Sequence, residues 1–316
     1  MRSSESAAIP VVPEQPLASS PRIGVALGSG ASRGLAHVGV MRALTEKGLQ
    51  VSFVAGTSMG AFVGSVYAAG NLQKLETDFQ AFDWRSVASL LDPVFPRSGL
   101  IDGQKVATLL SDYTSHRKIE DLSVRFHSVA TELFTGAEAI LDSGDVTDAV
   151  RASIAVPGLL TPVRLNGRIL LDGGLVNPVP VSVVRAMGAD VVIGVDVSID
   201  VLESRLARIH ETTIARPTAA AVRLHEILRA MNSPVATQLD EWMHRAPMPG
   251  IVDVLMSAVY VMQAQIARAN LERHPPDLLI RPPLGSIKFM DFDRAGEIIE
   301  LGYQAAKSAL AGWPVR

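Results

Sequence analysis

Apolar residues occur in short continuous runs along the chain, and each run is bounded by glycine or polar residues. Such runs are typical of strands that are buried on both faces of a sheet. We expect buried strands at Ile23–Leu27, Val51–Ala55, Arg168–Leu171, Val191–Asp196 and Asp277–Ile280. The segments Ser123–Thr131 and Ala139–Leu141 predict a further pair of strands.

Between these runs, apolar residues recur at the spacing of helices. The pattern predicts helices over Leu35–Lys47, Ala61–Ala69, Val146–Ile154, Pro180–Met187 and Asp291–Leu310, the last with Asp291 as its N-cap. The first strand, helix and second strand form a predicted right-handed βαβ unit, so the loops that follow both strands open at one edge of the sheet. The stretch from Val201 to Asn270 is mostly helical in pattern, and because strands recur on both sides of it we interpret it as an insertion over one core.

The chain of 316 residues is 48% hydrophobic and 19% charged, enough to build a sizeable core. We expect a disordered tail over residues 1–20, rich in serine, alanine and proline, and one domain over residues 21–316. The tail lacks the basic start and apolar centre of a secretory signal peptide. The longest nearly apolar segment, Ile251–Met262, is shorter than the roughly 20 residues that span a bilayer. These observations predict a soluble, cytoplasmic protein for which peripheral membrane contact remains open.

Charge and composition exclude several functions. The formal net charge is −3, and no cluster of lysine and arginine with interleaved aromatic residues indicates a nucleic-acid partner. The absence of cysteine excludes thiolate catalysis and cysteine-bound zinc. No grouping of histidine and acidic residues has the spacing of metal ligands, so we expect neither a metal nor a cofactor.

A Gly-x-Ser-x-Gly pentad follows the second predicted strand. Its serine, Ser58, lies between Gly56 and Gly60, and a helical pattern follows. At a sharp strand-to-helix turn a serine hydroxyl is exposed for attack on an ester, and small residues on either side permit the turn. Such pentads also arise by chance, but the strand before and the helix after make Ser58 a candidate nucleophile.

The first predicted strand is followed by a loop of small residues, from Gly28 to Gly34, that opens a helix. A dinucleotide site needs Gly-x-Gly-x-x-Gly and an acid after the second strand, and the chain has neither. The alternative is an oxyanion hole, in which backbone amides stabilise a tetrahedral intermediate on Ser58. The candidate residues are Gly28, Gly30, Ala31, Ser32, Arg33 and Gly34.

A carboxylate, Asp172, ends another predicted strand and is followed by Gly173 and Gly174. Such a carboxylate could accept the proton of Ser58 as a general base; the alternative is a surface turn, for which Asp-Gly is common. No histidine has the context of a catalytic triad. His274 precedes two prolines, and His37 is expected to pack or to cap its helix.

Together these motifs resemble the patatin-like phospholipase family, and most closely the bacterial single-domain members of its neuropathy-target-esterase branch. The resemblance extends over nearly the whole chain after the tail and includes Ser98–Gly103, Ala152–Pro157, Asn177–Pro178 and Met290–Asp293. It implies a three-layer α/β/α fold with a mainly parallel central sheet, Ser58 as nucleophile, Asp172 as base and the Gly-rich loop as oxyanion hole. Many members have glycine where this chain has Ser29 and Ala31, and alanine adopts a positive φ less readily.

The resemblance also implies a serine lipid acyl hydrolase that acts through an acyl-enzyme. The segments Leu90–Pro96 and Ile251–Met262 are candidates to line an acyl groove. Two alternatives stay open from sequence: an acyltransferase with the same Ser-Asp dyad, and a non-catalytic lipid-binding protein that kept the fold.

Overall fold

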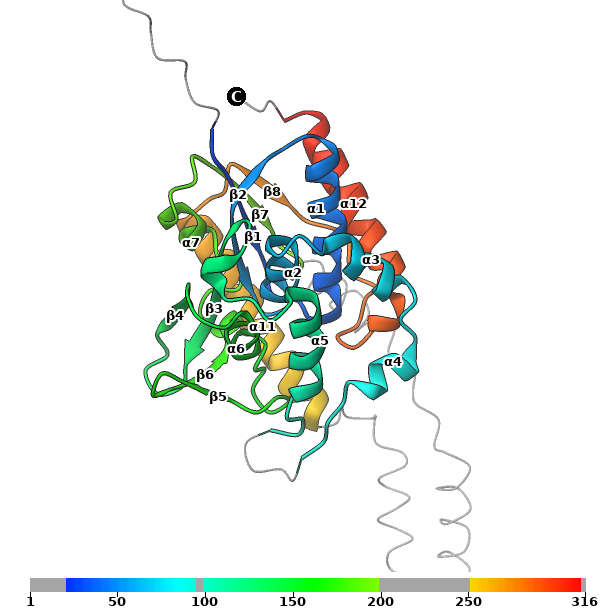
Figure 1. The fold of residues 1–316 in the computed structure, drawn as a ribbon, viewed down its shortest axis with the longest axis vertical. Coiled ribbons are helices and arrows are strands. Elements are labelled where there is room, and N and C mark those ends of the chain that lie inside the picture. Colours follow the sequence, from blue (N-terminus) through cyan, green and yellow to red (C-terminus); the bar gives the residue numbers. More distant parts are fainter. Residues whose placement is uncertain (1–20, 95–98, 199–250, 314–316) are drawn as a thin grey trace, which may run out of the picture.

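A computed structural model describes residues 21–94, 99–198 and 251–313 of the chain (Figure 1). Within these residues an eight-stranded sheet has the order β5-β6-β3-β2-β1-β7-β8, and β4 pairs with β3. The strands are β1 (Ile23–Leu27), β2 (Val51–Thr57), β3 (Arg125–Glu132), β4 (Glu138–Leu141), β5 (Val163–Leu165), β6 (Arg168–Asp172), β7 (Val191–Val195) and β8 (Leu278–Ile280).

The central strands of this sheet are parallel. β1 pairs in parallel with both β2 and β7, β2 with β3, and β7 with β8. The pairs of β3 with β4, β3 with β6 and β5 with β6 are antiparallel. The predicted strands and the mainly parallel sheet are therefore confirmed, including the adjacent parallel strands of the predicted βαβ unit.

Helices cover both faces of the sheet. The α-helices are α1 (Ala36–Glu46), α2 (Met59–Ala68), α3 (Leu72–Gln80), α4 (Trp84–Ser89), α5 (Gln104–Thr114), α6 (Val146–Ser153), α7 (Val181–Ala186), α11 (Ile251–Arg273) and α12 (Ala295–Ala311). Four 3-10 helices are also present in the described part: η1 (Ala31–Leu35), η2 (Ile119–Asp121), η3 (Gly173–Leu175) and η4 (Phe292–Arg294).

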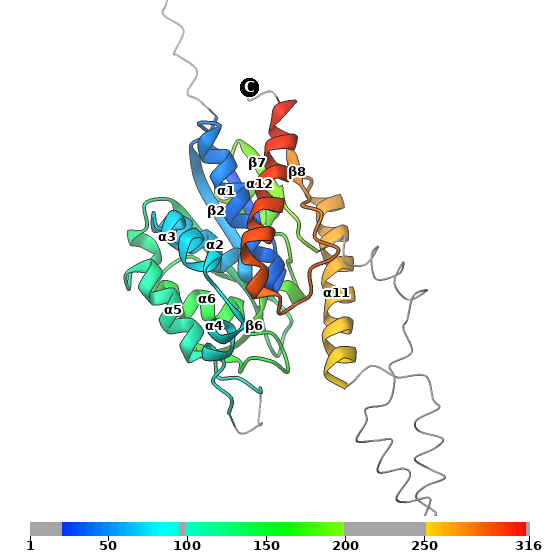
Figure 2. The ribbon, with the colours of Figure 1, turned by 90° about the vertical axis from the view of Figure 1, so that its right-hand side faces the viewer.

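Alternate side chains of β1 enter two different cores, because successive residues of a strand point to opposite faces. Val25 and Leu27 pack in the core with α1, α2 and α12, whereas Ala26 packs in a second core with α7 and α11. Figure 2 shows α3 and α5 on one side of β2, with α11 on the other side. The predicted three-layer α/β/α architecture is confirmed.

Two sequence predictions need correction. The Gly-rich segment 28–34 was predicted as a loop, but η1 begins within it at Ala31 and α1 begins at Ala36. Asp291 does not cap the last long helix, because η4 intervenes and Arg294 is the N-cap residue of α12. The Asp291 carboxylate instead accepts hydrogen bonds from the Lys288 amide and the Arg294 guanidinium.

Helices α3, α4 and α5 are present in the structure, although no helix was predicted there from the sequence. Of the predicted insertion over residues 201–270, α11 begins at Ile251 and extends to Arg273, past its predicted end. The remaining part of that insertion, and the tail over residues 1–20, lie outside the described residues.

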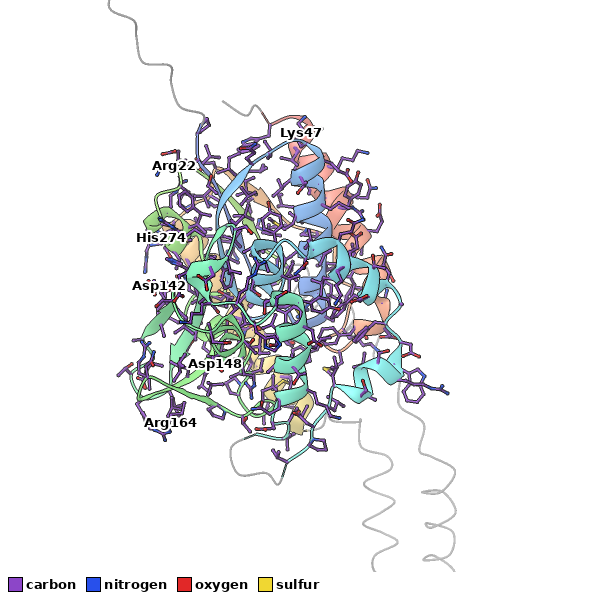
Figure 3. All side chains as sticks on the ribbon, viewed as in Figure 1. Arg22, Lys47, Asp142, Asp148, Arg164 and His274 are labelled. Carbon is purple, nitrogen blue, oxygen red and sulfur yellow. The ribbon has the colours of Figure 1, made fainter. Side chains whose placement is uncertain are left out.

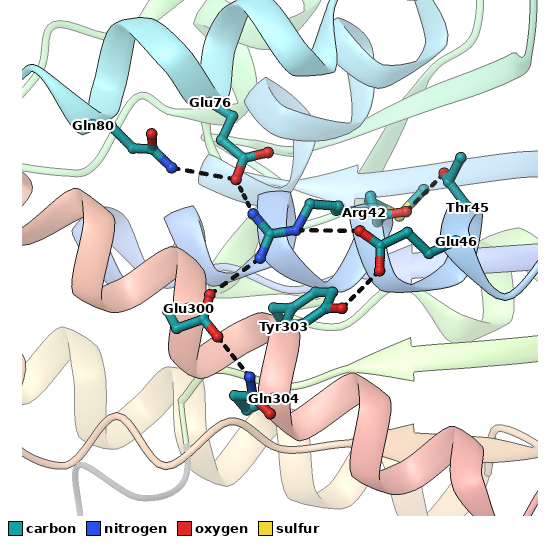
Figure 4. Close-up of polar contacts among 9 residues, drawn as sticks. Arg42, Thr45, Glu46, Glu76, Gln80, Glu300, Tyr303 and Gln304 are labelled. Atoms are coloured by element: carbon teal, nitrogen blue, oxygen red, sulfur yellow. Dashed lines mark hydrogen bonds and ion pairs between the residues drawn. The ribbon is translucent and has the colours of Figure 1, made fainter.

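α1 and α12 pack closely against each other on one side of the sheet, and the Gly-rich segment lies next to them. A Cβ atom added to Gly39 would lie 1.9 Å from the Ile299 carbonyl oxygen, so only glycine permits this approach. On the outer surface, Arg42 of α1 donates to Glu76 of α3 and to Glu300 of α12, and it stacks over the Tyr303 ring at 4.2 Å (Figure 4). These contacts fix α1, α3 and α12 relative to one another.

Candidate active site

Ser58 lies at the turn between β2 and α2, in a backbone conformation that is unfavourable for a residue with a side chain. Its φ and ψ are 57° and −123°, a conformation that non-glycine residues adopt rarely and that is characteristic of functional sites. The glycines of the pentad permit close packing around it. A Cβ atom on Gly56 would lie 2.3 Å from the Gly60 carbonyl oxygen, and one on Gly60 would lie 2.1 Å from that of Leu27. Two close contacts between backbone segments therefore hold the turn in its sharp conformation.

Asp172 reaches Ser58 because two strands of opposite direction end beside β3. β2 runs parallel to β3 and ends with Thr57 opposite Val129, while β6 runs antiparallel and ends with Asp172 opposite Ala130. Ser58, which follows β2, and Asp172, which ends β6, therefore lie close together. Ser58 and Asp172 line the same cavity, and the Ser58 hydroxyl interacts with the Asp172 carboxylate.

The turn after Asp172 also depends on glycine. A Cβ atom on Gly173 would lie 2.2 Å from the Val129 carbonyl oxygen, so no other residue fits there without a backbone shift. The Gly174 amide donates to Asp172 Oδ1 at 2.7 Å. Asp172 is completely buried, so this is not the exposed surface turn that Asp-Gly sequences often form.

The Asp172 carboxyl lies in a weakly solvated site. Burial raises its pKa to about 6, while hydrogen bonds from the Ser58 hydroxyl and the Gly174 amide act in the opposite direction. In the described part of the chain, Oδ2 accepts no hydrogen bond of regular geometry. The carboxylate is therefore mostly ionised at neutral pH, and its raised pKa makes it a better proton acceptor than an exposed aspartate.

Most amides of the segment from Gly28 to Gly34 are already used. The partners are carbonyl oxygens at 2.8–3.2 Å: Gly28 donates to Val195, Ser29 to Pro178, Ser32 to Phe289 and Arg33 to Gly30. Among the described residues, the amides of Gly30 and Ala31 donate to no protein group, and both residues line the cavity with Ser58. Gly34 lies in η1 and allows Met59 to pack close to it, since a Cβ atom there would lie 2.4 Å from the Met59 side chain.

The two positions where this chain lacks the usual glycines have distinct structural roles. Ala31 adopts φ 49°, the left-handed region in which alanine is less stable than glycine. The Ser29 hydroxyl donates to Gln263 Oε1 of α11 at 3.3 Å. These residues thus set the shape of the segment and connect it to the helix on the other face of the sheet.

His37 is buried behind the site, not in it. It donates from Nε2 to the Gly28 carbonyl oxygen at 2.7 Å, because a carbonyl only accepts. Burial lowers the pKa of His37 to about 4, so the ring is neutral and holds the Gly-rich segment in place. His274 is exposed and lies at the periphery of the molecule (Figure 3).

Ser153 and Gln263 were not identified from sequence as site residues. Ser153 Oγ accepts from the Ser58 amide at 2.8 Å and donates to the Val129 carbonyl oxygen at 2.5 Å, so it fixes the strained turn. Its segment contributed to the family resemblance, but the sequence alone assigned the hydroxyl no partner. Gln263 comes from α11 and is almost fully buried at 5% exposure.

Ser58 lies where an apolar cleft meets a smaller cavity. The cleft has a volume of about 140 Å³, and apart from Ser58 its lining consists of aliphatic and aromatic residues. Leu90 and Leu91 belong to the lining, as predicted for an acyl groove, whereas Met256, Val259 and Tyr260 from the other candidate segment line the smaller cavity. Four residues line both spaces: Ala31, Ser58, Val156 and Phe289.

Fold and site define an α/β protein with a serine on a strand-to-helix turn, a buried aspartate beside it and two free amides nearby. A sequence model of the family described as patatin-like phospholipase matches residues 25–185. The chain is 32% identical to an uncharacterized NTE family protein of Mycobacterium tuberculosis, over 94% of this chain and 93% of that protein. The chain therefore belongs to the patatin-like phospholipase family, which implies hydrolysis of lipid esters.

Other relatives are longer or more distant. The chain is 28% identical to human patatin-like phospholipase domain-containing protein 6, a match that covers 92% of this chain and 20% of the human protein. Among solved structures, VipD from Legionella pneumophila matches with a TM-score of 0.44 and 13% identity, over 92% of this chain and 67% of that one.

No helix among the described residues combines the length and hydropathy needed to cross a bilayer. The same residues contain no group of three or more histidine, cysteine, aspartate or glutamate side chains that is arranged to hold a metal ion.

Proposed function

We propose that the protein is a serine lipid acyl hydrolase, of the phospholipase, lysophospholipase or esterase type, that releases fatty acid in lipid degradation. One observation carries the proposal: the strained Ser58 interacts with a buried carboxylate, Asp172, at one end of an apolar cleft. The serine would serve as nucleophile, the carboxylate as base and the cleft as the site of the acyl chain.

In the first half-reaction, Asp172 accepts the Ser58 proton as Oγ attacks the ester carbonyl carbon. The amides of Gly30 and Ala31 are the proposed donors to the oxyanion. The other amides of the loop with known partners, those of Gly28, Ser29, Ser32 and Arg33, already donate to carbonyl oxygens. Asp172 then donates the proton to the departing alcohol, and an acyl-Ser58 ester remains. Water attacks this ester in the second half-reaction, with Asp172 again as base, and the fatty acid leaves.

The apolar lining of the cleft favours a long acyl chain as the part of the substrate that binds in it. Its lining comes from α2, α3, α4, α5 and the segment before η4, and aromatic residues such as Phe79 and Phe289 contribute to it. Leu91 and Met290 line the cleft and are also 37% and 40% exposed. We include peripheral membrane contact in the proposal, because such side chains would shield an acyl chain that moves from a bilayer into the cleft.

The test is fatty-acid release from mixed phospholipid and lysophospholipid micelles, measured by mass spectrometry. Wild-type protein should release fatty acid, and Ser58→Ala should reduce the rate to the uncatalysed level. Ser65→Ala is the matched control, because Ser65 is a buried serine of α2 that donates to the Phe62 carbonyl oxygen and does not line the cleft.

The products also separate the alternatives. An acyltransferase would convert lipid to a new ester with little free fatty acid. A non-catalytic lipid-binding protein would bind the micelles without product, and Ser58→Ala would bind them equally well. Either result contradicts the proposal.

A further inference from the structure

The edge of the sheet that carries Ser58 also carries exposed apolar side chains that the cleft does not use. Strands β1, β2, β3, β7 and β8 are parallel, so their carboxyl ends lie at one edge. Ser58 follows β2 there, and Leu133 and Phe134 follow β3. Phe134 is 79% exposed, the most exposed large apolar side chain in the described part of the chain. Neither Leu133 nor Phe134 lines the cleft or the small cavity, so binding of an acyl chain does not account for them.

The turn between β3 and β4 holds Phe134 in an ordered backbone. The Glu132 carboxylate accepts hydrogen bonds from the Phe134 amide at 3.3 Å and from the Thr135 amide at 2.8 Å. The Leu133 amide donates to the Ile169 carbonyl oxygen of β6 at 2.8 Å. Because the turn is already ordered, transfer of Phe134 into an apolar phase requires little further loss of backbone entropy.

A second exposed aromatic side chain lies on the helix beside the cleft. Trp84 is the first residue of α4 and is 67% exposed, and it is not itself a lining residue. Val87 lies three positions further, on the same face of the helix, and it lines the cleft. The apolar face of α4 therefore extends from the lining of the cleft outward to Trp84.

Other exposed apolar side chains belong to segments that line the cleft or the small cavity. Leu100 precedes the lining residue Ile101, and Leu255 precedes Met256, which lines the small cavity. Met290 both lines the cleft and is exposed. The opening of the cleft is therefore bordered by apolar side chains from several separate segments.

The opposite edge of the sheet is polar. The segments before β1, β2, β7 and β8 expose Arg22, Lys47, Asp190 and His274, respectively, and within the described ranges these segments contribute no exposed large apolar side chain. Figure 3 shows Arg22 and Lys47 at the upper end of the molecule, and Figure 1, in the same view, shows α4 towards the lower end. The exposed apolar side chains are thus concentrated at the end where the cleft opens, as expected for an interaction surface.

We propose that this end of the molecule is a docking face for the surface of a phospholipid bilayer, with Phe134 and Trp84 as its two anchors. The proposal rests on the proposed function and deepens it, because it names the surface through which a lipid ester would reach the cleft. Tryptophan combines an apolar ring with a polar N–H group, which suits the boundary between lipid and water. Both anchors lie outside the lining of the cleft, so docking and acyl binding depend on different side chains.

A bilayer fits this face better than a second protein chain does. A protein seated on side chains that border the opening would cover the route by which substrate enters, whereas a bilayer supplies substrate through it. Charges of both signs lie beside Trp84: the Arg85 guanidinium carbon is 5.5 Å from its ring centroid, and Asp83 caps α4. Docking should therefore depend mainly on apolar contact and little on anionic lipid.

The test is flotation of the full-length protein with phosphatidylcholine vesicles. Phe134→Ala and Trp84→Ala should each lower the partition coefficient roughly tenfold, the effect of removing one large apolar side chain that becomes buried. Added salt should change the partition little. Both variants should hydrolyse soluble p-nitrophenyl butyrate at the wild-type rate but release fatty acid from vesicles more slowly.

Ile140→Ala is the matched control. Ile140 is 40% exposed on β4, in the same hairpin as Phe134. It pairs with Val129, three residues and thus about 10 Å before the end of β3. An apolar side chain at that distance from the docking edge should not reach the bilayer, so its replacement should leave vesicle binding unchanged.

The failures of the two proposals are distinguishable. If wild-type protein hydrolyses p-nitrophenyl butyrate but does not float with vesicles, or if both anchor variants float as wild type does, the docking proposal is overturned and the hydrolase proposal is not. If wild-type protein floats through its anchors but releases no p-nitrophenol above the Ser58→Ala background, the proposed function fails, while the docking face is supported because flotation needs no turnover.

The same proteins test the other occupant of this face. Analytical ultracentrifugation without vesicles measures whether the chain associates with itself. A dimer that Phe134→Ala converts to a monomer, in a protein that does not float with vesicles, would assign the face to a second copy of the chain and overturn the docking proposal.

Discussion

At the scale of single residues, the proposed reaction depends on the protonation of Asp172. Burial raises its pKa to about 6, and only the ionised form can accept the Ser58 proton. The fraction of active base therefore approaches one above pH 6 and falls about tenfold per pH unit below it. We predict that kcat/KM for p-nitrophenyl butyrate follows this single ionisation, with no second loss near neutral pH from a histidine. A plateau that continues to well below the pKa of Asp172 would contradict its role as base.

Ser153 provides a second prediction at this scale. Its hydroxyl accepts from the Ser58 amide and donates to the Val129 carbonyl oxygen, so Ser153→Ala removes the partner of the Ser58 amide and one hydrogen bond to the Val129 carbonyl oxygen. We expect a loss of about 1–3 kcal/mol in the free energy of unfolding, together with slower acylation of Ser58. Urea denaturation measures the free energy of unfolding, and the rate of p-nitrophenol release measures acylation.

The control for Ser153 is Ser128→Ala. Ser128 is equally buried and donates to the Ala149 carbonyl oxygen, and among the described residues it makes no hydrogen bond to Ser58. This variant should lose stability without a matching loss in the rate of acylation per folded molecule. Equal kinetic effects in the two variants would show that Ser153 acts only through general stability.

At the scale of elements, the site depends on how strand ends and helices meet. The strand-to-helix turn at Ser58 was predictable, because an apolar run, a Gly-x-Ser-x-Gly pentad and a helical pattern are adjacent in sequence. That Asp172 lies beside Ser58 was a hypothesis drawn from its position at a strand end, and the family resemblance supported it. An apolar run does not show the direction of its strand, and the pair forms because β6 runs antiparallel to β3.

Other parts of the site were beyond sequence reasoning for a physical reason. Gln263 approaches Ser29 across 234 positions of the chain, and neither residue belongs to a periodic pattern that points to the other. Asp291 was assigned to a helix cap from its residue type, but its carboxylate is used by a loop amide. Side-chain hydrogen bonds between distant segments depend on tertiary packing, which local propensity does not encode.

The packing of α12 on α1 yields a prediction for this scale. A Cβ atom on Gly302 would lie 2.0 Å from the Ala36 carbonyl oxygen, whereas one on Gly296 of the same helix meets no atom within 4 Å. Gly302→Ala should therefore lower the free energy of unfolding by about 1–3 kcal/mol or more, and Gly296→Ala should leave it unchanged or raise it slightly, since alanine favours helix. Thermal denaturation of both variants measures the difference. Similar melting temperatures would show that the two helices separate without cost.

At the scale of the whole molecule, the two helical layers contribute different halves of the site. Helices α2, α3, α4 and α5 build the apolar cleft, while α11 on the other face closes the small cavity beside Asp172. The sheet between them brings Ser58 to the junction. In the proposed function the acyl chain binds in the cleft, so substitutions of its lining residues should change the preference for acyl length, which fatty-acid release from esters of different chain length measures.

The most direct measurement of the central claim is labelling of the purified protein with a fluorophosphonate probe, followed by mass spectrometry of the modified peptide. The probe reacts with a serine only where a base activates it. We predict modification at Ser58 in wild type, a sharp decrease in Asp172→Asn, and none at that peptide in Ser58→Ala. Folded wild-type protein that leaves Ser58 unmodified, or an Asp172→Asn variant that is labelled as fast as wild type, would contradict it.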